Sequence, residues 1–180
     1  APLVENYNYK KTDYHEDVKS NSSNHKRMQF VPGCAMFFNI KNVKQVGFFD
    51  ENFFLFFEET DLCMKVKKRS EKVYMCPDLK LDHLGWQGSF ATDNNLEEES
   101  DRLRSWHYMW SFFYYHKKNY GYIYAFTKSF SRLLRSIVRI IFYLITFNKK
   151  QRIIYTYRFL GLINSILLKK SYFRINLKDQ

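Results

Sequence analysis

The chain has 180 residues, of which 46% are hydrophobic and 19% aromatic, with only three prolines and six glycines. That composition supplies enough apolar surface for a core and excludes a chain that is disordered throughout. The three cysteines form no Cys-x-x-Cys pair, which argues against a disulfide framework and a zinc knuckle. They are typical of small buried apolar residues in a reducing compartment.

The net charge of +11 is unevenly distributed. Residues 1–101 carry 13 Lys/Arg and 17 Asp/Glu, a net charge of −4, whereas residues 102–180 carry 16 Lys/Arg and one acid, a net charge of +15. An acidic body followed by a basic tail predicts that the tail meets an anionic partner. Nucleic acid and a membrane surface both fit the charge, but no nucleic-acid motif accompanies it, which favours the membrane.

The first half of the chain predicts an alternation of strands and helices. Residues 1–29 are polar and without a period, which indicates a connecting arm. Four segments are expected to be extended, namely residues 30–40, 53–57, 72–78 and 79–86. Two are expected to be helices, namely residues 41–47, which end at Gly47, and residues 58–72. This order indicates an α/β layer.

The second half predicts three helices, over residues 103–118, 123–147 and 153–168. In the second, the apolar residues keep a period of three to four, and four basic residues form a stripe on the other side. The stripe consists of Lys128, Arg132, Arg135 and Arg139.

This tail is not expected to cross a membrane. Its longest uncharged runs are residues 140–148 and 159–168, nine and ten residues, whereas a span needs about 18. The basic stripe instead predicts a helix that lies on an anionic membrane surface. The alternative is a surface helix packed on its own domain.

Three carboxylates follow the apolar run Phe53–Phe57, namely Glu58, Glu59 and Asp61. Acids in the first turn of a helix complement the helix dipole, which also keeps them ionised, and they are commonly only structural. Their predicted position at the C-terminal edge of a buried strand indicates a ligand site as well. The next extended segment ends near His83, and a histidine beside carboxylates suggests a metal or acid–base site.

A series of motifs runs through residues 30–86. It consists of a Gly-x-x-Met segment, a short helix, a Gly-x-Phe-Asp-Glu turn, two phenylalanines followed by an acid pair and Asp-Leu, a basic helix, a strand with proline, and a histidine. The series resembles the C-terminal half of the catalytic domain of family 2 glycosyltransferases, in particular the rhamnosyltransferase-like bacterial members. The matching residues are Gly33, Met36, Gly47, Phe49, Asp50, Glu51, Phe53, Phe54, Glu58, Glu59, Asp61, Leu62, Pro77 and His83.

The resemblance implies an α/β fold of the GT-A type and an inverting transfer of a sugar from a nucleotide-sugar to an acceptor hydroxyl. The acceptor-side half of that fold is expected in residues 1–101, with residues 1–29 as a polar arm. Residues 102–180 are expected to form an α-helical amphipathic tail. The implied acceptor is a saccharide or a lipid-linked intermediate of cell-surface polysaccharide or glycolipid synthesis. The expected location is cytoplasmic, peripheral at the inner face of the plasma membrane.

The resemblance also implies roles for single residues. Glu59 matches the family's general base, which is usually Asp, so the carboxylate here reaches one methylene further. Glu58 matches the preceding acid, which orients the base or the acceptor. The acceptor side is expected to include Asp50, Asp61 and Trp86.

The family uses a divalent cation, Mg²⁺ or Mn²⁺, which an Asp-rich motif in the donor half holds on the sugar diphosphate. Residues 1–29 contain no match to that motif, so His83 is the one metal ligand expected here. The chain is therefore expected to be a fragment that does not turn over by itself. The alternative is a non-catalytic module that binds membranes or glycan intermediates and lacks the donor half.

Overall fold

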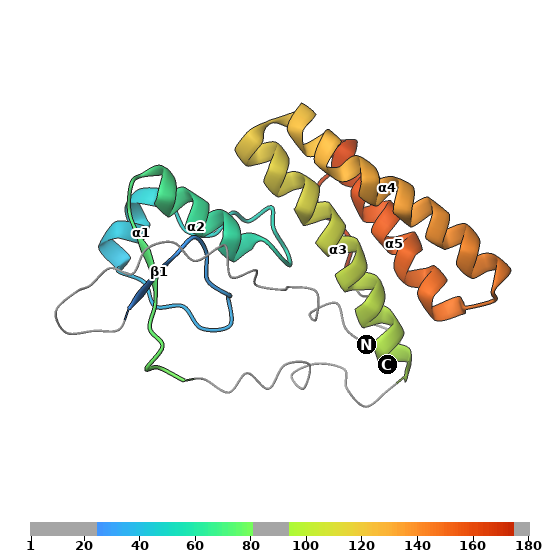
Figure 1. Cartoon of the computed structure of the whole chain (residues 1–180), viewed down its shortest axis with the longest axis horizontal. Coiled ribbons are helices and arrows are strands. Elements are labelled where there is room, and N and C mark those ends of the chain that lie inside the picture. Colours follow the sequence, from blue (N-terminus) through green and yellow to red (C-terminus); the bar gives the residue numbers. More distant parts are fainter. Residues whose placement is uncertain (1–24, 81–93, 175–180) are drawn as a thin grey trace. The chain divides into compact units, whose positions relative to one another are not determined.

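The computed structural model describes residues 25–80 and 94–174. They fall into two compact units, which we call the sheet unit (residues 25–50 and 59–80) and the helix unit (residues 51–58 and 94–174). Five helices and one two-stranded sheet make the described part of the chain mixed but mostly helical (Figure 1). The predicted α/β class is confirmed only to that extent, and the GT-A fold stays a prediction.

The sheet of the sheet unit has two short strands. β1 (Lys26–Met28) pairs antiparallel with β2 (Val73–Met75), and Arg27 lies opposite Tyr74. β2 confirms the strand predicted at residues 72–78, in a shorter form. β1 lies in the predicted polar arm, so that prediction is wrong here. A strand this short and polar carries no period of its own and depends on its partner.

The two helices predicted in this unit are confirmed. α1 (Ile40–Val46) begins after Asn39, whose side chain accepts a backbone N–H of the first turn at 3.1 Å. It ends at Gly47, whose φ of 73° favours glycine. α2 (Glu58–Lys68) follows the segment at residues 53–57 and buries Leu62.

Two predicted strands are wrong. Residues 30–40 contain no strand and turn at Gly33, directly after a proline, which interrupts a regular ladder. Residues 53–57 form a series of bends. Phe56 and Phe57 have φ values of 66° and 69°, left-handed values that a strand excludes.

The helix unit is a bundle of α3 (Asn94–Tyr120), α4 (Tyr122–Ile145) and α5 (Lys149–Ile166), which pack side by side (Figure 1). All three predicted helices are confirmed, and α3 starts earlier than predicted. Gly121 separates α3 from α4 with a φ of 92°, which favours glycine. The side chain of Asn148 caps α5 by accepting a backbone N–H at 3.1 Å.

The phenylalanine-rich segment at residues 53–57 docks on α3. The ring centroids of Phe53 and Tyr114 are 4.9 Å apart. Phe57 lies within 5.5–5.9 Å of three further rings of α3, those of Tyr108, Phe112 and Tyr115. A strand would direct successive side chains to opposite faces, whereas this segment bends so that several rings reach one helix.

α5 approaches α3 closely where it carries small residues. A Cβ added to Gly161 would lie 2.1 Å from the backbone oxygen of Trp106, so only glycine fits at this contact. About one turn further, Ser165 Oγ donates to the backbone oxygen of Trp110 at 2.9 Å. The two helices therefore meet backbone to backbone along one turn.

We predict that Gly161→Ala lowers the free energy of unfolding of the chain by about 1–3 kcal/mol, the usual cost of overpacking. The higher helix propensity of alanine alone would raise the free energy of unfolding by up to about 1 kcal/mol. A decrease therefore indicates the steric clash, and an increase would indicate that alanine fits. Urea unfolding followed by far-UV circular dichroism measures it. Leu160→Ala, at the exposed neighbouring position, is the control, and a Gly161→Ala protein as stable as the wild type would contradict the close contact.

His107 holds the last described residues against α3. Its buried ring donates from Nε2 to the backbone oxygen of Phe173 at 2.7 Å and accepts at Nδ1 from Ser171 Oγ at 3.1 Å. This pattern requires the neutral imidazole. Burial lowers the pKa of His107 from 6.5 to about 4; the bond to Phe173 opposes that shift and the charge of Arg174 adds to it.

We predict that the free energy of unfolding falls as the pH is lowered from 6.5 to about 4. In that window the unfolded chain takes up a proton at His107 and the folded chain does not, so acid favours unfolding. One pKa unit corresponds to about 1.4 kcal/mol, so the loss reaches about 3 kcal/mol at most. His107→Gln removes this titration. Urea unfolding at stepped pH should therefore give a flatter profile for the variant, and equal slopes would contradict the prediction.

Candidate functional site at the start of α2

α2 begins at Glu58, so the predicted acid pair occupies its first turn. The backbone N–H groups of a first turn have no partners within the helix and attract negative charge. The sequence placed Glu58 and Glu59 correctly at a helix start. The buried strand expected before them is absent, since residues 53–57 bend.

Glu58 is half-buried. Its Oε2 is enclosed and accepts no hydrogen bond from the described residues. Burial raises the pKa of Glu58, and a bond to its own backbone N–H opposes the rise only in part. The start of a helix is expected to lower the pKa of a carboxyl group. At Glu58 burial has the larger effect, so the pKa is raised. A carboxyl group in this state holds a proton more readily than an exposed one.

Glu59 lies beside the turn at Gly33. A Cβ added to Gly33 would lie 3.5 Å from Cβ and 3.8 Å from Cδ of Glu59, in ordinary van der Waals contact. Burial raises the pKa of the neighbouring Cys63 thiol; a bond to the Val31 backbone opposes this and the charge of Glu59 adds to it. The segment around Gly33 thus packs on the first turns of α2, next to the predicted base.

Asp61 is only 1% exposed. Its carboxylate lies 3.8 Å from Nζ of Lys65, which also donates to the backbone oxygen of Phe48 at 2.7 Å. Lys65 thereby joins α2 to the turn after α1. Asp50, at the end of that turn, is half-buried. The roles of Asp50 and Asp61 at an acceptor remain predictions.

His83 and Trp86 lie outside the described residues, as does most of the extended segment predicted at residues 79–86. Within residues 25–80 and 94–174, no three His, Cys, Asp or Glu side chains come together as a metal site. The predicted metal contact of His83 and the acceptor contact of Trp86 therefore stay predictions.

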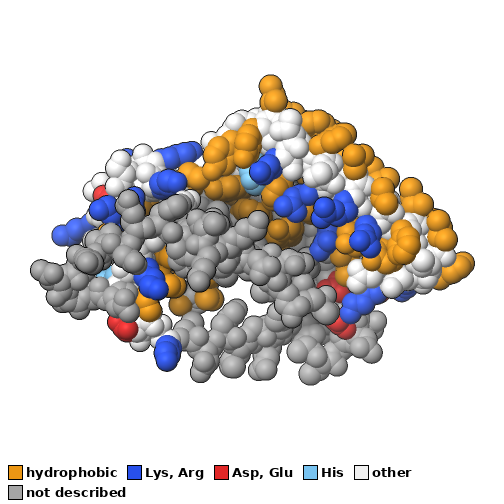
Figure 2. Space-filling view, viewed as in Figure 1, with side chains coloured by type: hydrophobic (Ala, Val, Ile, Leu, Met, Phe, Trp, Pro, Cys, Tyr) orange, Lys and Arg blue, Asp and Glu red, His pale blue; other side chains and the backbone are white. Residues whose placement is uncertain are grey.

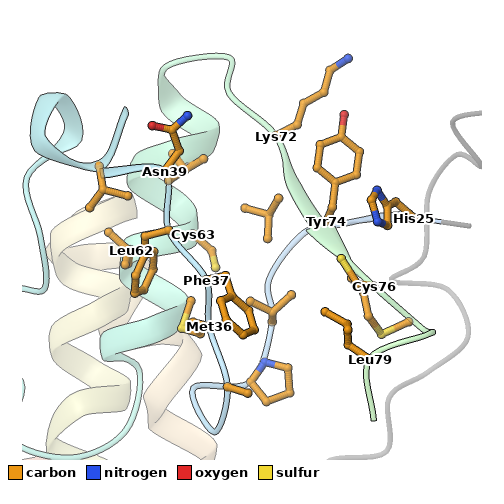
Figure 3. A pocket seen from close by; sticks show the side chains of 18 of the residues that line it. His25, Met36, Phe37, Asn39, Leu62, Cys63, Lys72, Tyr74, Cys76 and Leu79 are labelled. Atoms are coloured by element: carbon orange, nitrogen blue, oxygen red, sulfur yellow. The ribbon is translucent and has the colours of Figure 1, made fainter. Parts of the chain in front are cut away.

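The sheet unit also contains an open apolar hollow of about 890 Å³ (Figure 3). Figure 3 shows side chains from α2, β2 and the segment before α1 around it, including Phe37, Leu62 and Tyr74. Phe37 is 91% exposed, so the hollow opens to solvent. Its walls come from several separate segments, which is why no sequence period reveals it. Such a surface suits a partly apolar group, and charged side chains such as Lys72 and Lys80 also line it.

Protein-family models, curated proteins and solved structures give no match to this chain. The resemblance to family 2 glycosyltransferases is therefore carried by the motifs in residues 30–86.

The basic stripe of α4 lies partly on aromatic rings. The Arg132 guanidinium is half-buried, 4.2 Å from the ring centroid of Phe112, and Arg139 Nη1 donates to the hydroxyl of Tyr143 at 3.2 Å. Lys128 and Arg135 are exposed. None of the helices in the described ranges combines the length and apolar character that crossing a bilayer demands.

We predict that Glu58→Gln leaves the free energy of unfolding at neutral pH equal to or above that of the wild type. A carboxyl group whose pKa is raised stabilises the fold below its ordinary pKa of 4.5, and this stabilisation is lost as the pH rises through the folded-state value. The amide of Gln has nearly the same shape and does not ionise. The free energy of unfolding of the variant should therefore rise relative to that of the wild type between pH 4.5 and neutrality. Urea unfolding measures this difference.

The exposed Glu71 supplies the matched control, since Glu71→Gln makes the same change outside the first turn of α2. Its difference from the wild type at neutral pH gives the effect of this change of side chain at an exposed position. A Glu58→Gln protein that is clearly less stable than the wild type at neutral pH would contradict an unfavourably buried carboxyl group.

Proposed function

We propose that this chain supplies the acceptor-side half of an inverting family 2 glycosyltransferase, which moves a sugar from a nucleotide-sugar to an acceptor hydroxyl. The observation that carries the proposal is the packing of Glu59 against Gly33. Both residues belong to the motifs of the family, they lie far apart in the sequence, and the fold brings them together at the start of a helix.

In the proposed reaction Glu59 is the general base. Its carboxylate takes the proton of the acceptor hydroxyl while that oxygen forms a bond to the anomeric carbon of the donor. The bond from this carbon to the phosphate oxygen breaks, and its electron pair leaves with the nucleoside diphosphate. Attack from the face opposite the leaving group inverts the anomeric centre.

The neighbouring acid supports this assignment. Burial raises the pKa of Glu58, whose Oε2 is enclosed, whereas the side chain of Glu59 lies against the turn at Gly33. Different environments for two adjacent carboxyl groups are a usual way of dividing roles between them. In the proposal Glu58 orients the base or the acceptor, and Asp50, Asp61 and Trp86 lie on the acceptor side.

When bound, Mg²⁺ or Mn²⁺ would neutralise the diphosphate that leaves. The described residues bring no three His, Cys, Asp or Glu side chains together as ligands for the ion. His83 is the residue proposed to contact it or the diphosphate. The proposed acceptor is a saccharide or a lipid-linked intermediate, and the proposed place of action is the cytoplasmic face of the plasma membrane.

The open apolar hollow favours a second candidate, a non-catalytic module that binds glycan intermediates or membranes. The coding sequence upstream of Ala1 separates the two candidates. A strand-rich stretch with an Asp-x-Asp motif would support the enzyme, whereas a start codon next to Ala1 would support the module.

We predict that Glu59→Gln, in an enzyme that also carries a donor half, lowers kcat by at least about 100-fold, the usual contribution of a positioned base. The amide cannot accept the proton, and the unchanged size of the side chain preserves the fold. Transfer of a radiolabelled sugar from nucleotide-sugars to extracted acceptors measures the effect. Glu71→Gln should retain the wild-type kcat.

Near-normal turnover of Glu59→Gln would remove this residue from the role of base. No transfer by the wild type from any nucleotide-sugar, together with binding of glycan intermediates, would favour the module.

A further inference from the structure

α4 exposes large apolar side chains along its whole length. We call the set formed by Ile123, Phe130, Leu134, Val138, Ile141 and Ile145 the outer face of α4. They recur at intervals of three, four or seven residues and therefore share one side of the helix. Figure 2 shows hydrophobic side chains along the free edge of the helix unit where α4 runs.

The fully buried residues of α4 are small. Ala125, Ser129 and Ser136 are at most 2% exposed, whereas Ile123 is 80% exposed. A helix that packs on a water-soluble domain usually turns its large apolar side chains inward. α4 packs Leu133 on the core, but its fully buried positions hold small residues and most of its large apolar side chains lie outside, an arrangement frequent among helices that meet lipid. A continuous apolar surface of this kind indicates an interaction site.

Basic residues flank the outer face on the side turned toward α3. Lys128, Arg135 and Arg139 are exposed there, and the neighbouring Arg132 lies on Phe112 of α3. Figure 2 shows Lys and Arg side chains in a row beside the hydrophobic edge. Apolar side chains next to lysines and arginines match a bilayer, in which acyl chains lie beneath anionic phosphates.

Charge argues against a second copy of the chain on this face. Residues 102–180 carry a net charge of +15, so a two-fold contact would bring two basic rows together. Nucleic acid would satisfy the basic row but would leave the outer face exposed to water. An anionic bilayer satisfies both features.

We propose that the helix unit binds anionic membranes by inserting the outer face of α4 below the headgroups, with Lys128, Arg135 and Arg139 at the level of the phosphates. Insertion of the apolar face provides most of the binding free energy. The three basic residues add a preference for anionic lipid. The inference refines the membrane contact of the proposed function and is independent of sugar transfer.

Co-sedimentation of the full chain with two kinds of vesicle tests the proposal. One is made of phosphatidylcholine alone, and the other also contains phosphatidylglycerol. The wild type should bind the anionic vesicles more tightly, and high salt should weaken that binding only in part, because salt screens charge and not apolar insertion.

Two variants separate the apolar and basic contributions. Leu134→Asp/Ile141→Asp should lower binding to both kinds of vesicle by at least about 10-fold. Arg135→Glu/Arg139→Glu should remove the preference for anionic vesicles and keep the weaker binding to phosphatidylcholine. Ile40→Asp makes the same apolar-to-acid change at an exposed position of the sheet unit outside the hollow and should bind as the wild type does.

All four substituted positions of the two double variants are exposed, so far-UV circular dichroism should be unchanged. A wild type that stays in the supernatant with both vesicles, or an outer-face variant that binds as the wild type does, overturns the proposal. Self-association of the wild type that the outer-face variant abolishes, without vesicle binding, also overturns it. Sugar transfer to a water-soluble acceptor is measured separately, so either proposal can fail alone.

Discussion

The architecture of the helix unit depends on the contact between the backbones of α3 and α5 at Gly161. Because a Cβ cannot fit against Trp106 there, the helices approach more closely than large side chains would permit. Ser165 donates to α3 one turn later, and α4 contributes Ala125 to the same core. Because the fully buried residues of α4 are small, most of its long aliphatic side chains are left on the surface.

Local signals in the sequence predicted the helices and β2, and they failed for the segments at residues 30–40 and 53–57. Period and glycine positions place α1, α4 and α5 within a few residues, since a helix satisfies its hydrogen bonds internally. The run at residues 53–57 is as apolar as a buried strand, but its conformation is decided by α3, where Ser111 donates to the Leu55 backbone at 2.7 Å. The sequence around β1 does not predict a strand either, because β1 forms only by pairing with β2, which lies far along the chain.

In the candidate site, too, the sequence predicts the local features and not those that depend on tertiary packing. The sequence locates Glu58 and Glu59 at a helix start, which is a local property. It cannot show that Asp61 is enclosed beside Lys65, or that Oε2 of Glu58 is buried without a hydrogen bond from the described residues, because both depend on packing with distant segments. The burial of Glu58 and Asp61 thus arises from tertiary structure and not from their positions in the helix.

The positions of the tryptophans make the two units differ in their intrinsic fluorescence. Its three tryptophans all belong to residues 84–180, so the sheet unit contains none. Trp106 and Trp110 are buried in the helix unit with their rings stacked at 6.4 Å and inclined by 10°. Emission from Trp106 and Trp110 therefore reports the melting of the helix unit, whereas the circular dichroism of the amides reports both units. Comparing the two signals during denaturation would reveal whether the units unfold together or in succession.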